Sequence, residues 1–376
     1  MFFGKNRRAG ALVFLCLAAC GGHARNATAP FDAPTRSGWD LFNQPEVLAG
    51  LHVYTTRFAD LPAKAELESK PWRGAFWPDQ AAGIAARWQW RTPHNFAYVP
   101  PAKSEIAGLT QAEISRLSPA EKLDIYNGRF DYPTFERERA RTDARALPWE
   151  GLCDGLAVSQ LLYAEPKPVL MKGADGVSIP FGSADVKALL AYEKGVLQRP
   201  RQDVVGVQCT APDSAANARC KSDMNAGTFH VVLANQVGVL GRAFLADVDW
   251  TAEVWNHVVY GYSTNVTAER APSSGAAAGT EREILVETTV RLSLIREPAW
   301  APEPANDDLD GYQKYAYALE LDARGRIVGG EWLSEEHPDF LWNVDPAEGA
   351  PEKLSLGIEA IYRASVASSG SIPPPQ

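Results

Sequence analysis

The chain has 376 residues, of which 45% are hydrophobic and 22% are charged, and its formal net charge at pH 7 is -9. This length is enough for a sizeable hydrophobic core in one large domain or two smaller ones. An aromatic content of 10% excludes a chain that is disordered throughout, and the acidic balance, without a basic patch, excludes nucleic acid as the expected partner.

Residues 1–19 have the form of a lipoprotein signal peptide. Lys5, Arg7 and Arg8 precede an apolar run, and small residues stand directly ahead of Cys20. The run is too short to span a bilayer, which takes about 20 apolar residues. We therefore expect an exported cell-envelope lipoprotein of a bacterial outer membrane or periplasm, lipid-anchored at Cys20. The alternative is an ordinary secretory peptide that happens to contain a cysteine.

The remaining chain divides by composition. Residues 20–38 are small, polar and proline-containing, which predicts a linker after the lipidated cysteine. Residues 39–362 predict a single catalytic domain, within which 39–107 form a segment that could cover the site. Residues 363–376 are rich in Ser, Gly and Pro and predict a disordered tail.

Helices are predicted in the first half of this domain. Capping boxes at Thr110 and Ser118 predict two short helices, and the charged stretch 135–145 indicates a third. Residues 149–162 predict a turn followed by an apolar helix. Residues 183–194 predict a further helix, capped by its first serine.

Strands are predicted in the second half. Residues 229–236 and 244–250 alternate in hydrophobicity and predict a hairpin. Residues 283–296 predict a strand, and 315–321 with 326–332 predict a second hairpin. Because the helices come first and the strands later, the pattern favours an α+β fold over alternating βαβ units.

The cysteines point to one unpaired thiol. Cys209 and Cys220 bracket a short loop in an exported chain, and a disulfide between them would stabilise the fold by about 2–3 kcal/mol. Cys153 is then the odd thiol of the mature chain. An unpaired thiol in an exported protein is a candidate nucleophile, whereas a buried inert cysteine is the usual structural interpretation.

The surroundings of Cys153 favour the nucleophile. The predicted helix begins at about this residue, so its thiol would feel the positive end of the helix dipole, which favours thiolate. Backbone N–H groups of the same turn could hold an oxyanion. Glu150 and Asp154 work against thiolate, so an imidazolium is needed nearby.

A base and an orienting carboxylate are available on the predicted hairpin. His230 opens the first strand, and Asp247 and Asp249 share one face of the second because side chains alternate along a strand. Asp247 is preferred, since it follows an apolar stretch where an unpaired carboxylate would be costly. Cys153, His230 and Asp247 then form a papain-like triad of nucleophile, base and orienter. A lone histidine on a strand is more often an ordinary core or surface residue.

Several of these stretches resemble the transglutaminase elicitor family, secreted protein-glutamine γ-glutamyltransferases best known from oomycetes, with bacterial relatives. The resemblance runs from about Ser118 to Trp342. It is most specific at Trp149-x-Gly-x-Cys153, and in residues 227–235, 244–247, 329–332 and 337–342.

The resemblance implies a papain-like or transglutaminase-like core in which the helix with Cys153 packs on an antiparallel sheet carrying the histidine and the aspartate. It implies Cys153 as nucleophile, His230 as base and Asp247 as orienter, with Asp249 as the rival third member. Trp149 would shield the thioester from water. Family members are often calcium-dependent, and without an EF-hand loop a calcium site would need dispersed acids.

The expected reaction joins a glutamine carboxamide to a lysine or a small primary amine through a Cys153 thioester, with deamidation when water attacks instead. One alternative is a thiol peptidase or amidase on the same triad. Another is a non-catalytic binding lipoprotein, which a fully buried Cys153 or a distant His230 would favour.

Overall fold

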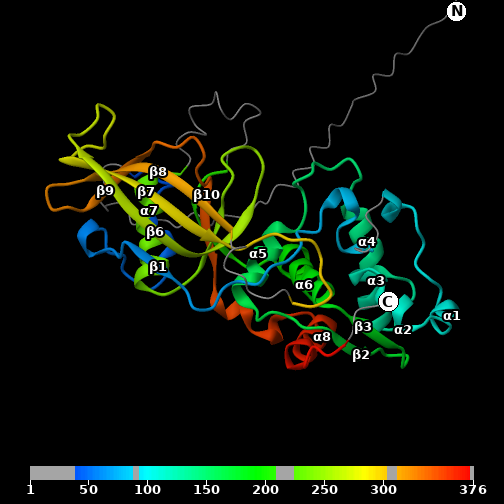
Figure 1. The fold of residues 1–376 in the computed structure, drawn as a ribbon. Helices are drawn as coiled ribbons and strands as arrows, with labels where there is room; N and C mark the ends of the chain where they lie inside the picture. Colours follow the sequence, from blue (N-terminus) through cyan, green and yellow to red (C-terminus); the bar gives the residue numbers. More distant parts are fainter. Residues whose placement is uncertain (1–38, 88–92, 209–223, 303–310, 373–376) are drawn as a thin grey trace, which may run out of the picture.

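The structure is a computed structural model that describes residues 39–87, 93–208, 224–302 and 311–372. Strands gather in one half of the molecule and most helices in the other, with helix α5 (Cys153–Leu162) between them (Figure 1). This mixture of helices and antiparallel sheet confirms the α+β prediction.

The main sheet is antiparallel and eight-stranded, in the order β4-β10-β5-β6-β7-β8-β9, with β1 paired to β6. Its strands are β1 (Lys64–Glu66), β4 (Gln202–Gly206), β5 (Phe244–Asp247), β6 (Asn256–Arg270), β7 (Arg282–Leu292), β8 (Gly311–Leu321), β9 (Ile327–Trp332) and β10 (Phe340–Val344). A two-stranded sheet pairs β2 (Val169–Lys172) with β3 (Ser178–Phe181).

Local chemistry explains several of these elements. Both predicted capping boxes are present, because the Thr110 and Ser118 side chains accept from the N–H groups of Glu113 and Glu121. The predicted β8–β9 hairpin is also confirmed. At its turn the Asp322 carboxylate accepts backbone N–H groups of the turn and pairs with the side chain of a turn arginine.

The α-helices are α1 (Lys103–Ile106), α2 (Gln111–Ser115), α3 (Pro119–Tyr126), α4 (Pro133–Arg141), α5, α6 (Ser183–Tyr192), α7 (Ala226–Leu233) and α8 (Leu356–Ala367). Helix α6 continues into a π-helical turn, η6 (Glu193–Leu197), and α7 into another, η8 (Ala234–Val239). Short 3-10 turns are η1 (Pro45–Leu48), η2 (Phe58–Asp60), η3 (Asp79–Ala81), η4 (Gly83–Ala85), η5 (Pro93–Phe96), η10 (Pro346–Gly349) and η11 (Pro351–Lys353).

The main sheet buries both of its faces, and different helices cover them. On one face, Leu245, Val258 and Trp342 pack against α5 through Ala157 and Val158. On the other face, the alternate residues of the same strands join a larger core with α7; this core includes Phe244, Val259 and Leu341 together with Phe229 and Val231. We call these the α5 face and the α7 face.

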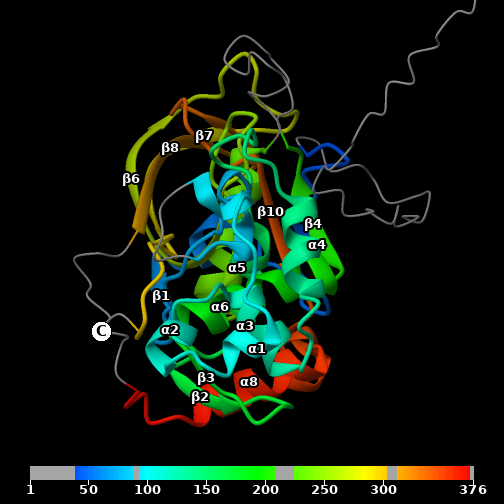
Figure 2. The same ribbon diagram turned by 90° about the vertical axis from the view of Figure 1, so that its right-hand side faces the viewer.

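The helix-rich half has its own core and a buried ion pair. Helices α3, α4, α6 and α8 share this core with the small sheet (Figure 2). Within it Lys122 Nζ lies 2.6 Å from Asp185 Oδ2, and both side chains are fully buried. Because breaking a buried pair leaves an uncompensated charge, this contact holds α3 against α6.

Four predictions about local structure are wrong. Ser183 does not cap helix α6, because the helix begins at Ser183 after Gly182 and the serine hydroxyl donates to the Pro166 carbonyl. Residues 229–236 do not form a strand: Asn225 caps helix α7 by accepting the N–H groups of Gly227 and Thr228, and the helix runs into η8. The strand after it ends at Asp247 and does not reach residue 250. The tail predicted to begin at residue 363 is still helical through Ala367, because α8 packs on the helix-rich core.

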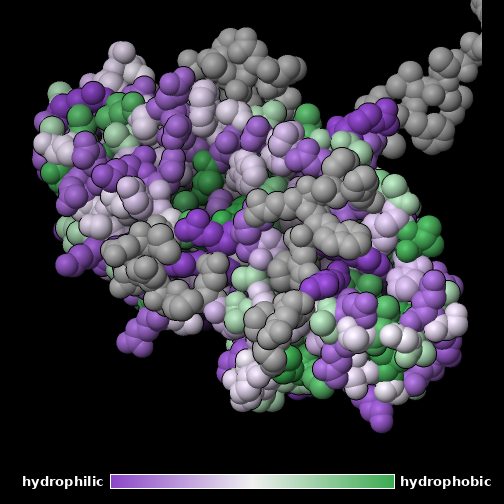
Figure 3. Space-filling view, turned by 45° about the vertical axis from the view of Figure 1, so that its right-hand side comes forward, coloured by the Kyte–Doolittle hydropathy of each residue, from purple (hydrophilic) through white to green (hydrophobic). Residues whose placement is uncertain are grey.

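Some predictions lie outside the described residues. They are the signal peptide 1–19, lipidation at Cys20, the linker 20–38 and the disulfide between Cys209 and Cys220, and all of them stay predictions. Among the helices that the structure describes, none combines the length and apolar character needed to cross a membrane. On the face in Figure 3, apolar side chains lie in small groups among polar ones.

Candidate active site

Cys153 is the first residue of helix α5 and is only 5% exposed. Its thiol donates to the carbonyl oxygen of Val254, with Sγ and the oxygen 3.4 Å apart. The side-chain amide of Asn256 donates to the same sulfur across 3.8 Å. The sulfur therefore lies between the N-terminus of α5, where the helix dipole favours negative charge, and the start of strand β6.

Asn256 is itself held by a tryptophan. Trp342 Nε1 donates to Asn256 Oδ1 across 2.7 Å, and both side chains are almost fully buried. The sequence reasoning missed both residues as members of the site. Their positions, far from Cys153 in the chain, give no sequence signal of this contact.

A short segment from the N-terminal region lies against the residues that precede Cys153. We call residues 76–79 the strap. Leu152 N–H donates to the Phe76 carbonyl across 2.6 Å, and Asp79 N–H donates to the Glu150 carbonyl across 2.8 Å. Residue 151 is a glycine because a β-carbon there would lie 2.8 Å from the Phe76 ring and carbonyl. The strap belongs to the segment 39–107, for which a covering role stays a prediction.

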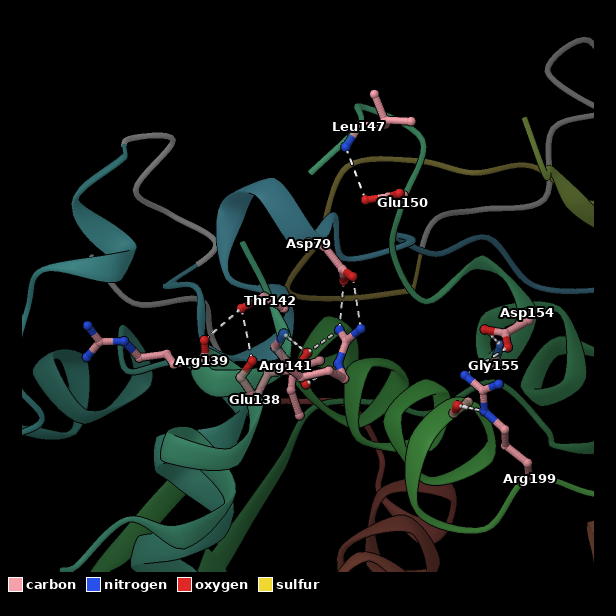
Figure 4. Close-up of polar contacts among 12 residues, drawn as sticks. Asp79, Glu138, Arg139, Arg141, Thr142, Leu147, Glu150, Asp154, Gly155 and Arg199 are labelled. Atoms are coloured by element: carbon pink, nitrogen blue, oxygen red, sulfur yellow. Dashed lines mark hydrogen bonds and ion pairs between the residues drawn. The ribbon is translucent and has the colours of Figure 1, made fainter. Parts of the chain in front are cut away.

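The strap is fastened at both ends. At one end the Phe76 ring packs edge-on against Trp255, with centroids 5.3 Å apart. At the other, Arg141 of α4 makes two hydrogen bonds to the Asp79 carboxylate and two to Glu138 (Figure 4). Between them, buried Trp77 has a φ of 50°, a left-handed conformation that is strained for a bulky residue.

The first turn of α5 is pressed against the end of α6. A β-carbon at Gly155 would overlap the Ala191 carbonyl oxygen and would lie 2.7 Å from Gly195 N. The Asp154 carboxylate oxygen Oδ2 lies 3.7 Å from a guanidinium nitrogen of Arg199 (Figure 4). Arg199 follows the π-helical turn η6 in the chain. Burial raises the pKa of the Asp154 carboxyl, although Arg199 partly opposes the shift. A carboxyl with a raised pKa opposes the thiolate less than the sequence suggested.

His230 does not reach the sulfur in this structure. It lies on α7, on the opposite face of the sheet from α5, where its Nδ1 is 2.8 Å from Tyr317 Oη. The tyrosine hydroxyl is in turn 2.7 Å from Thr288 Oγ1. Burial lowers the pKa of His230 to about 4, so the imidazole is neutral at pH 7. His230 is a hydrogen-bonded core histidine here.

The two candidate aspartates differ in their surroundings. Asp247 is buried at the end of β5, directly opposite Asn256 in the pairing of β5 with β6, so it shares the α5 face with that residue. Its Oδ1 accepts the Trp255 N–H across 2.8 Å. Asp249 lies beyond the end of the strand, where its carboxylate caps a turn by accepting from Thr251. Alternation of side chains along a strand would place both aspartates on one face, but strand β5 ends at Asp247, so the rule does not extend to Asp249.

Trp149, the predicted shield of the thioester, and two further histidines remain to be placed. Trp149 is half-buried on the loop before Cys153. His257 follows Asn256 but points to the other side of β6, and its Nδ1 is 2.7 Å from the Ser293 carbonyl oxygen. The side chain of His94 lies outside the described residues. Within the described part of the chain no group of three His, Cys, Asp or Glu side chains is arranged to hold a metal ion, so calcium binding stays a prediction.

A cavity of about 1510 Å³ lies at the far end of α5 from Cys153. Its walls include the last turn of α5, the residues after β10 and parts of the segments 48–52 and 67–73. None of Cys153, Asn256 and Asp247 lines it, so the cavity is separate from the thiol site.

The fold thus combines helices with an antiparallel sheet, and a buried thiol lies at the N-terminus of α5 against that sheet. Residues 136–359, more than half of the chain, match the transglutaminase elicitor family, and the chain belongs to this family.

The fold is also similar to that of a solved structure. The chain is similar to the GP42 transglutaminase of Phytophthora sojae, with a TM-score of 0.64 and 22% identity, over 86% of this chain and 98% of that chain. The comparison with curated proteins gives no match.

We expect the strap to limit access to the thiol, so that loosening it exposes Cys153. In Asp79→Asn the partly exposed bridge to Arg141, worth about 0.5–1 kcal/mol, is lost. We expect iodoacetamide to alkylate Cys153 about two- to fivefold faster at a pH where the thiol is ionised. The rate is measured by mass spectrometry of the Cys153 peptide. Asp143→Asn, which removes an exposed pair with Arg145 on the following loop, is the matched control and should leave the rate unchanged. An equal rate in Asp79→Asn and the parent would contradict the covering role.

The burial of His230 has a consequence for stability. Its pKa is about 4 in the folded state and about 6.5 when unfolded, so the unfolded state binds the proton first as the pH falls. The free energy of unfolding should therefore drop by about 3 kcal/mol between pH 6.5 and pH 4 through this residue. In His230→Asn, which keeps a polar atom near Tyr317, that part of the pH dependence should vanish in urea titrations. His52→Asn, at an exposed position, is the control. A parent and a His230→Asn variant with parallel pH profiles would show that His230 titrates normally.

Proposed function

We propose that the chain is a protein-glutamine γ-glutamyltransferase that acts through a thioester at Cys153. The observation that carries the proposal is the position of the thiol, at the first residue of α5 and in contact with Val254 and Asn256. Family membership and the likeness of the fold to a solved transglutaminase support it.

In the proposed reaction, the Cys153 sulfur attacks the carbon of a protein glutamine carboxamide. The carbon–nitrogen bond breaks, ammonia leaves with the proton, and a thioester remains. The amine of a lysine side chain or of a small molecule then attacks the thioester carbon. The carbon–sulfur bond breaks, an amide forms, and the amine proton restores the thiol. Attack by water in place of the amine gives glutamate. The positive end of the α5 dipole would stabilise the negative charge that develops on the carboxamide oxygen.

The carboxylate of the proposed site is Asp247. It is buried on the same face of the sheet as Cys153 and opposite Asn256, whereas Asp249 turns to its own loop. His230 on the α7 face is not part of the proposed site, so the group that takes the thiol proton is not assigned to it.

A second function has observations in its favour. Cys153 is 5% exposed and His230 lies on the opposite face, which are the features expected of a binding module that keeps the fold without the chemistry. The strap offers another explanation of the first feature, because a segment that lies against the residues before Cys153 could shield the thiol until it moves. Turnover assays distinguish the two functions.

The first assay follows a labelled primary amine into a glutamine-bearing protein. Cys153→Ser keeps the shape of the side chain but removes the thiol, so incorporation should fall about a thousandfold or more. Ammonia release measured with and without the amine separates transfer from hydrolysis by a peptidase or amidase. Incorporation by Cys153→Ser at the parent rate would refute the thioester. Absence of turnover in both the parent and Asp79→Asn would favour the binding module.

The second assay separates the two aspartates. Asp247→Asn removes a buried charge on the α5 face, and we expect kcat for amine incorporation to fall roughly a hundredfold. Asp249→Asn changes a turn beyond the strand and should keep kcat within about twofold. Thermal unfolding of both variants controls for stability. The reverse order of the two effects would make Asp249 the functional carboxylate.

A further inference from the structure

Two polar groups meet the Cys153 sulfur, and they favour different protonation states. The Val254 carbonyl accepts from the thiol and therefore stabilises the protonated form. The Asn256 amide donates to the sulfur and therefore stabilises the negative form. The contact at 3.8 Å is long for a neutral thiol, and a charged sulfur would draw the donor closer.

The direction of the Asn256 amide follows from its second contact. An indole N–H donates and cannot accept, so the atom 2.7 Å from Trp342 Nε1 must be the amide oxygen. The NH₂ group is then the end that faces the sulfur. In most proteins the two ends of an asparagine are hard to tell apart, but here the donor-only partner decides between them.

The sheet explains how Trp342 reaches this residue. Strand β5 lies between β10 and β6, with Trp342 opposite Leu245 and Asp247 opposite Asn256. The indole therefore crosses β5 along a diagonal, on the face that α5 covers. Trp342 and Asn256 lie on strands separated by one strand, roughly 10 Å apart across the sheet, and the long indole spans most of this distance to reach the amide oxygen.

We propose that Asn256 is a catalytic residue that stabilises the negatively charged sulfur of Cys153, and that Trp342 is the positioning residue that aims its amide. The catalytic part rests on the proposed function. The effect on the sulfur itself does not, because it needs only the ionisation of the thiol. No proton leaves Asn256 in this role: it donates a hydrogen bond while the thiol proton goes to another acceptor.

Packing alone does not account for this pair. Both side chains are nearly excluded from water between α5 and the sheet, where apolar residues would fill the space without polar groups to satisfy. A buried amide with one end on an indole and the other on a sulfur is costly unless both ends are used. The second end already meets the sulfur at 3.8 Å, and a negatively charged sulfur would strengthen this contact.

The test is the pH dependence of Cys153 alkylation by iodoacetamide in the full-length protein, followed by mass spectrometry of the Cys153 peptide. In Asn256→Ala the thiolate loses its donor, so the midpoint of the profile should rise by about one pH unit. Asn256→Asp keeps the shape and the contact with Trp342 but turns a negative oxygen to the sulfur, and should raise the midpoint further. A structural defect that changes access to Cys153 would change the alkylation rate at the high-pH plateau. The midpoint of the profile, by contrast, reports the ionisation of the thiol.

Trp342→Phe tests the positioning role. It keeps a large ring but removes the indole N–H, so the amide is no longer aimed and the midpoint should rise, by less than in Asn256→Ala. Trp332→Phe is the matched control, since it also removes an indole hydrogen bond, to the Met224 carbonyl, from a half-buried tryptophan on the α7 face. In the double variant Asn256→Ala/Trp342→Phe, the second change should add nothing to the midpoint.

An unchanged midpoint in both Asn256→Ala and Asn256→Asp would overturn the proposal, as would a shift of equal size in Trp332→Phe. If Asn256→Ala does not fold, Asn256→Asp and Trp342→Phe decide the outcome by the same measurement. These results do not depend on turnover. Amine incorporation by Cys153→Ser at the parent rate would refute the thioester, but the measured midpoint of the thiol would still stand.

Discussion

The position of the nucleophile depends on the contact between helices α5 and α6 at Gly155. Any side chain at this residue would overlap the backbone of α6, so α5 can lie this close only with glycine there. The contact comes two residues after Cys153 and fixes the first turn of α5 against the π-helical end of α6. The other side of the same turn then meets the start of β6. A helix N-terminus held between two rigid elements is the preorganisation that nucleophilic catalysis needs.

The contacts of the Cys153 sulfur depend on this placement of the first turn of α5. The thiol meets the Val254 carbonyl just before β6 and the Asn256 amide at its start, and a carboxylate from β5 lies opposite the amide. The strap lies against the residues just before Cys153, with the strained Trp77 at its centre. Strain of about 1–3 kcal/mol in such a segment persists only while its fastenings hold.

Much of the fold was predictable where local chemistry decides structure. The capping boxes at Thr110 and Ser118 and the hairpin turn at Asp322 are such places, and the structure has all three. Residues 229–236 were misjudged because a short apolar run of Val and Leu suits a buried helix as well as a strand. The cap at Asn225 was the signal that distinguishes them. At the site, Cys153 was recognisable from cysteine arithmetic and its motif. Asn256 and Trp342 were not, because their contact depends on the order of three strands and on the register between them.

The central claim is that Cys153 carries the acyl group, and the most direct measurement is to trap it there. A glutamine-bearing peptide is mixed with the protein without any amine, the reaction is quenched in acid, and the Cys153 peptide is weighed by mass spectrometry. We expect an adduct at Cys153 with the mass of the peptide less ammonia, discharged by a primary amine with formation of the corresponding amide. An adduct at another residue, or amide product formed while Cys153 stays unmodified, would contradict the account.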